Sequence, residues 1–153
     1  MKKIFAILLI GLTSLTIFTG CTSKNVEGNL EDLMTKVYNE LPQEETPMML
    51  QNVEVNAENM EYYLGVSDID IKEALASESA TGSIAHSVVL VRLNDGKDVN
   101  DVMTKIKENV NPRKWICVGV EEDNIIVKNK GNLIILIMTD TNKEILEKGF
   151  DNL

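Results

Sequence analysis

Two uninterrupted apolar runs constrain the fold of this chain more than any other feature. Val88–Val91 lies inside a strand-like segment from Ile84 to Leu93, and Leu133–Met138 is the most apolar stretch beyond residue 20. Successive residues of a strand point to opposite faces, so a continuous apolar run needs cover on both faces. Six residues are too few to cross a bilayer. We therefore predict that both runs are central strands of a sheet.

Three segments have the apolar spacing of amphipathic helices. Asn29 is a good N-cap for Leu30–Leu41, and Asp98 for Val99–Val110. Thr141–Glu144 has the spacing of a capping box at the start of a last helix. The order of these helices and the strands predicts an α+β fold, with a mostly antiparallel sheet backed by amphipathic helices.

The remaining elements are predicted from weaker patterns. Lys114–Val120 and Ile125–Lys128 are expected to be strands, and Asn129–Asn132 a tight reversal. Asp68–Lys72 alternates between charged and apolar residues, which favours a short strand. Ser77–Ser83 is small and polar, and is expected to form a turn.

The N-terminus has the order of a secretory signal peptide: a positive start, the apolar run Ile4–Phe18, and small residues before Cys21. Its end resembles the lipobox of bacterial lipoproteins, in which the cysteine is alkylated with diacylglycerol before cleavage. Phe18 departs from that pattern, which most often has Leu. We predict a signal peptide over residues 1–20, a lipidated Cys21 and short tether over 21–28, and one domain over 29–153.

An uncleaved membrane helix and an ordinary secretory signal are the alternatives. A membrane helix needs about 20 apolar residues, and an ordinary signal ends in a site of the A-x-A type. Lipidation of Cys21 places the protein at the cell membrane, lipid-anchored, on the extracytoplasmic side. The formal charge of the whole chain is −9, and cleavage of the signal peptide, which contains Lys2 and Lys3, would change it to −11. Phosphates would be repelled by this charge, so we expect no nucleic acid partner.

Few side chains carry recognisable chemistry. Asp68 and Asp70 could present two carboxylates on one face of a strand and are the candidate cation ligands. His86 is the single histidine and is expected to be a surface or half-buried residue, whereas Cys117 is expected to be a buried, inert thiol. Glu121–Asp123 is a charged turn that could also bind a cation. No catalytic motif and no cofactor motif is present.

Some apolar residues lie next to irregular segments, and the sequence does not decide whether they are buried or exposed. Met48–Leu50 and Tyr62–Tyr63 belong either to the core or to a partner-binding surface. Trp115, the single tryptophan, is expected to be a core anchor.

The chain also resembles a family of small, mostly Gram-positive bacterial lipoproteins classed as a domain of unknown function. The similarity rests on Tyr63 and Gly65, the strand Ile84–Leu93, the helix Val99–Val110 and the closing run Val127–Ile137. It implies the location and the fold and carries no catalytic residues. We therefore expect an accessory module that binds a protein or peptide, through its sheet edge or through residues 42–65. A carboxylate-based hydrolase of envelope material and a cation-binding module are the alternatives.

Overall fold

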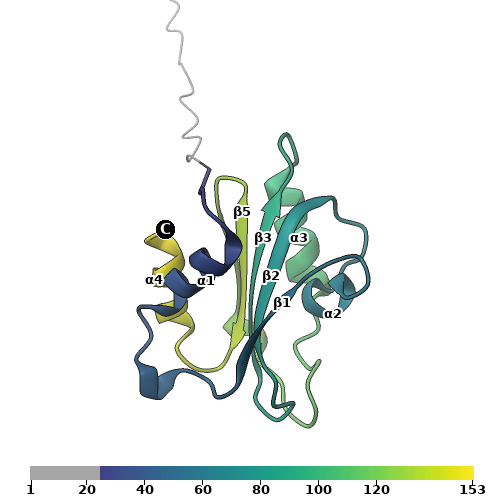
Figure 1. Ribbon diagram of the computed structural model, residues 1–153. Helices are drawn as coiled ribbons and strands as arrows, with labels where there is room; N and C mark the ends of the chain where they lie inside the picture. The colour runs from purple at the N-terminus through teal and green to yellow at the C-terminus, as the bar shows by residue number, and fades with distance from the viewer. Residues whose placement is uncertain (1–24) are drawn as a thin grey trace, which may run out of the picture.

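The computed structural model describes residues 25–153, so the predicted signal peptide and Cys21 lie outside the described residues. A five-stranded antiparallel sheet has the order β1-β2-β3-β5-β4. Its strands and the helices around it are drawn in Figure 1. The strands are β1 (Leu50–Glu54), β2 (Ile71–Ser79), β3 (His86–Leu93), β4 (Ile125–Lys130) and β5 (Leu133–Thr139). The helices are α1 (Leu30–Tyr38), α2 (Met60–Leu64), α3 (Val99–Asn109) and α4 (Lys143–Asp151), with single turns of 3-10 helix at η1 (Gln43–Glu45) and η2 (Glu122–Asn124).

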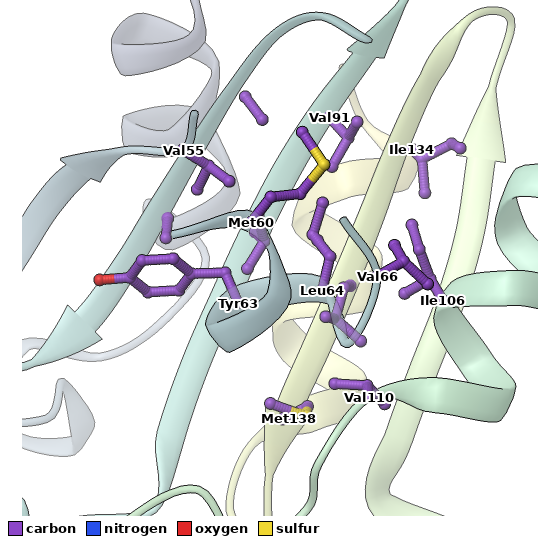
Figure 2. Close-up of a cluster of buried hydrophobic side chains, with 14 of the residues drawn as sticks. Val55, Met60, Tyr63, Leu64, Val66, Val91, Ile106, Val110, Ile134 and Met138 are labelled. Carbon is purple, nitrogen blue, oxygen red and sulfur yellow. The ribbon is translucent and has the colours of Figure 1, made fainter. Parts of the chain in front are cut away.

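The two apolar runs form β3 and β5, which pair with each other inside the sheet, as predicted. Their side chains divide the core into two clusters. One lies under α2 and α3, where Leu64 and Ile106 meet Ile134 (Figure 2). The other lies under α1 and α4, where Val37 and Phe150 meet the opposite face. The sheet is therefore the middle layer of three, which satisfies both faces of the apolar strands.

Capping explains two of the helices. The Asn29 side chain accepts from the backbone N–H of Asp32, and Asp98 accepts from Asn100 and Asp101. The capping box predicted at Thr141 is wrong. α4 begins after Asn142, which has a φ of 59° and makes no side-chain cap.

Two further predictions are corrected by the packing. The segment Lys114–Val120 is a loop and not a strand, because Trp115 and Val120 are buried while Ile116 and Cys117 between them face solvent. The expected turn at Ser77–Ser83 begins later, since β2 continues through Ser79, with Glu78 paired to Ser87 of β3 and Ser79 to Leu50 of β1. β1 and α2 were not predicted, because neither has a clear apolar period.

The chain ahead of α1 is attached to the sheet. Arg92, near the end of β3, donates from Nη2 to the carbonyls of Val26 (3.2 Å) and Gly28 (2.8 Å). Asn132 N–H donates to the Asn25 side chain at 3.2 Å. The part of the predicted tether from Asn25 onwards is thus held by the domain, at the end of the sheet where β3 finishes (Figure 1).

Candidate functional site

A buried lysine lies at the opposite end of the sheet, where β3 begins. Lys114 comes from the loop between α3 and η2, and its Nζ lies 2.7 Å from Oε2 of Glu78 in β2. The same Nζ lies 3.1 Å from Oγ of Ser87 in β3. Glu78 and Ser87 are cross-strand partners, so the sheet register brings them together. The lysine side chain is 2% exposed and that of the glutamate 9%, which removes this ion pair from water.

Aromatic rings enclose the ammonium group. Its Nζ lies 4.5 Å from the ring centre of Tyr62, 4.7 Å from that of Tyr63 and 5.2 Å from that of Trp115. A cation over aromatic faces is attracted by their negative π surface. The Tyr62 hydroxyl also donates to Oε1 of Glu78 at 2.9 Å, so the carboxylate binds both the cation and the tyrosine.

Burial dominates the electrostatics of this cluster. Desolvation lowers the pKa of Lys114, and the neighbouring Glu78 opposes that shift. Desolvation and the hydrogen bond to Glu78 raise the pKa of Tyr62. A serine beside a lysine can act as a nucleophile and its base. Ser87, however, is 0% exposed, so a substrate cannot reach its hydroxyl in this conformation. The arrangement instead anchors the loop that carries Lys114 to the sheet.

Four large hydrophobic side chains are exposed around this anchored loop: Ile116 (73%), Met48 (71%), Met49 (66%) and Tyr62 (45%). We call them the distal patch. The sulfur of Met49 accepts a hydrogen bond from the Thr81 hydroxyl at 3.7 Å. Gly82 follows Thr81 in the chain, and its carbonyl accepts from the backbone N–H of Ile116 at 2.9 Å. Tyr62 connects to the same end of the sheet through Glu78 and Lys114. The patch therefore gathers residues from three separate parts of the chain.

A polar hollow of about 460 Å³ adjoins the distal patch. Tyr62 and Lys114 form part of its wall, and Glu58 and Glu61 add negative charge. The rest of the lining is Gly65, which follows α2, Asn109 at the end of α3, and Asn111 just after α3. A ligand here would meet the carboxylates of Glu58 and Glu61, amides, one tyrosine ring and Lys114, whose ammonium is already paired with Glu78. The unpaired charge of the lining is therefore negative, which suits a cationic group.

The predicted cation ligands do not form a cluster. Asp68 and Asp70 are exposed and precede β2, so the strand expected at Asp68–Lys72 starts only at Ile71. Asp70 already binds Lys97 and accepts from Asn94, which lower the pKa of its carboxyl. Within residues 25–153 no three His, Cys, Asp or Glu side chains are grouped to hold a metal ion.

Two single-residue predictions were wrong, and one is confirmed. His86 is buried, because Tyr38 of α1 covers the start of β3 and bonds His86 Nε2 at 2.7 Å. Cys117 is exposed, because its backbone has a φ of 63° and turns the loop outwards. Trp115 is buried in the cluster under α2 and α3, as expected. Glu121–Asp123 lies exposed around η2.

No pattern in the sequence predicts the Lys114 cluster. Its members come from an irregular loop, from a stretch expected to be a turn and from the start of a strand, and only the tertiary fold joins them. For Met48, Met49 and Tyr62 the sequence leaves core and surface positions open, and the structure places all three on the surface.

No protein-family model matches the chain, and neither a curated protein nor a solved structure is similar to it. Among residues 25–153, no helix has the length and apolarity needed to cross a membrane.

Proposed function

We propose that this protein is an extracytoplasmic lipoprotein, anchored to the cell membrane through Cys21, which binds a protein partner through the distal patch. The predicted lipobox and the resemblance to small bacterial lipoproteins support the anchor. The observation that carries the binding role is that Met48, Met49, Tyr62 and Ile116 are exposed, and that bonds to Glu78, Thr81 and Gly82 hold them at one end of the sheet. Exposed hydrophobic residues that cluster in this way mark interaction sites more often than isolated ones.

The attachment of Asn25–Gly28 supports this arrangement. Only Thr22, Ser23 and Lys24 separate Cys21 from the residues that the sheet holds. Four residue steps span at most about 14 Å, so a lipidated Cys21 would keep the Arg92 end of the sheet near the bilayer. The eight residues of β3 extend about 26 Å from that end. The distal patch would then face away from the membrane, where a partner can reach it.

The anchor is tested on the purified protein by mass spectrometry of the mature N-terminus. We expect a chain that begins at Cys21 and carries a diacylglycerol thioether. Replacement of Cys21 by Ser should release the protein from the membrane fraction. An unmodified Cys21, or an N-terminus upstream of it, would refute the anchor while leaving the patch to be tested separately.

The binding surface is tested by placing a photoreactive amino acid at Met49 in cells. We expect one discrete cross-linked protein, absent when the probe is at Asp95 in the exposed loop after β3 at the opposite end of the sheet. Ile116→Asp, which charges the patch without touching the core, should weaken the same adduct. Equal cross-linking from both positions, or none from Met49, would contradict a specific distal partner.

A further inference from the structure

The outer edge of β1 offers unpaired backbone groups. Val55 N–H donates to Ala74, and Ala80 N–H donates to Met49 O, so the odd-numbered residues of this segment bond to β2. In an antiparallel pair the alternate residues point their N–H and C=O groups the other way. These are Leu50 and Asn52, which have no neighbouring strand on that side within the described residues. The carbonyl of Glu54, which ends the edge, accepts from the Asn59 side chain at 3.0 Å.

The two edges of the sheet are protected differently. At the β4 edge, Lys107 of α3 donates from Nζ to the carbonyl of Ile125, and the strand itself carries Lys128 and Lys130. Lysines on an edge strand discourage the addition of another strand. β1 contains neither lysine nor proline, and Gln51 and Asn52 are exposed. Of the two edges, β1 is the one open to pairing.

The charge around β1 indicates what could pair with it. Between Lys36 and Lys72 the sequence contains no lysine or arginine. The acids in that interval are Glu40, Glu44, Glu45, Glu54, Glu58, Glu61, Asp68 and Asp70. Glu40 is paired with Lys148 and Asp70 with Lys97, and the other six form no ion pair within the described residues. A second copy of the chain would bring the same negative charge to the edge and be repelled. A basic segment would be attracted, and such complementarity raises association rates and excludes wrong partners.

We propose that β1 receives an extended, basic segment of the partner protein as a sixth strand. The segment would exchange backbone hydrogen bonds with Leu50 and Asn52, as in other cases of strand addition. Its lysine or arginine side chains would be attracted by the exposed glutamates in and just before β1, Glu44, Glu45 and Glu54. Its apolar side chains would contact Met48 and Met49 at the start of β1. This inference rests on the proposed function, since it assigns the chemistry of the partner that the distal patch binds.

The test uses the mature chain with Ser in place of Cys21, because both core clusters are built from residues 26 onwards. The probe is a heptapeptide of alternating lysine and valine, and the control is the same peptide with glutamate for lysine. We expect the basic peptide to bind at low salt and to slow amide hydrogen exchange at Leu50 and Asn52. The acidic peptide should do neither.

A proline substitution separates strand addition from simple charge attraction. Asn52→Pro removes an N–H that points away from β2, a place where edge strands tolerate proline. It should weaken binding of the basic peptide by about tenfold, the effect of one lost hydrogen bond with an unpaired carbonyl left behind. Asn52→Ala keeps the N–H and should bind like the parent chain. The unfolding transition of each variant shows whether the fold is intact.

Three results would overturn the inference: no binding of the basic peptide, binding without protection of Leu50 and Asn52, or equal binding by both variants. If Asn52→Pro does not fold, the exchange data on the parent chain decide alone. These outcomes are separate from the proposed function. Cross-linking from Met49 that persists without strand addition would leave a distal partner in place and reject only its mode of binding.

Discussion

Mild acid should destabilise this domain through His86. The imidazole is 2% exposed, Nε2 bonds the Tyr38 hydroxyl, and Nδ1 has no hydrogen-bond partner among the described residues. Burial lowers the pKa of His86 from 6.5 to about 4. The protonated ring would carry a charge and a second N–H into a site that solvates neither. Burial raises the pKa of Tyr38, so its hydroxyl stays neutral and supplies no negative charge to offset the charged imidazole.

The sign and size of the effect follow from linkage. A folded pKa below the unfolded one means that the unfolded chain binds the proton first. The stability that depends on a neutral His86 is therefore fully present above pH 6.5, and it is lost as the pH falls towards 4. Between pH 7 and 5.5 the two pKa values of His86 give a loss of about 1 kcal/mol in the free energy of unfolding. This interval lies above the ordinary titration range of carboxylates, so His86 dominates it.

The assay is urea unfolding at pH 7.0 and 5.5, followed by far-UV circular dichroism, for the parent chain and two variants. His86→Gln removes the titrating group and should show little change between the two pH values. Tyr38→Phe removes the hydroxyl but keeps the burial that causes the shift, and should retain most of the pH dependence. If the parent chain loses no more stability than His86→Gln, the histidine is not buried in its neutral form and the reasoning fails.

Three further predictions concern stability. Lys114→Met leaves Glu78 buried without its cation, so it should lower the free energy of unfolding, measured in urea, by about 3–5 kcal/mol. The double variant with Glu78→Gln should recover most of that loss. Gly149→Ala should destabilise despite a better helix propensity, because its Cβ would lie 2.2 Å from a backbone carbonyl of α1; a net loss of at least about 1 kcal/mol is expected, and an unchanged melting temperature would contradict it. Millimolar calcium should leave the melting temperature unchanged, because Asp70 already binds Lys97; a rise would restore the cation-site hypothesis.

The sequence predicts those parts of the fold in which the local pattern of apolar and polar residues shows which side chains are buried. The runs in β3 and β5 are apolar on both faces, so their central position was evident. α1 and α3 have regular apolar spacing and genuine caps at Asn29 and Asp98. β1 could not be predicted, because an edge strand that is largely exposed has no apolar pattern to recognise.

The candidate site shows the opposite case. Lys114 lies beside an apolar run, and the pattern predicts a strand for both, but its ammonium instead enters a pocket made by Glu78, Ser87, Tyr62, Tyr63 and Trp115. Cys117 followed the same apolar pattern, and the loop turns it outwards. Periodicity measures hydrophobicity along the chain and contains no information about which distant polar groups will meet.

By itself, the sequence determined a covered sheet with two apolar central strands and two capped helices, because these follow from local hydrophobicity and hydrogen bonding. It also predicts the anchor at Cys21, which depends on a linear motif and lies outside residues 25–153. Only the tertiary structure decided that Lys114 is buried, that His86 is covered by α1 and that Met48, Met49 and Ile116 share one exposed end. Those outcomes depend on contacts between segments far apart in the chain, which form only when the layers pack.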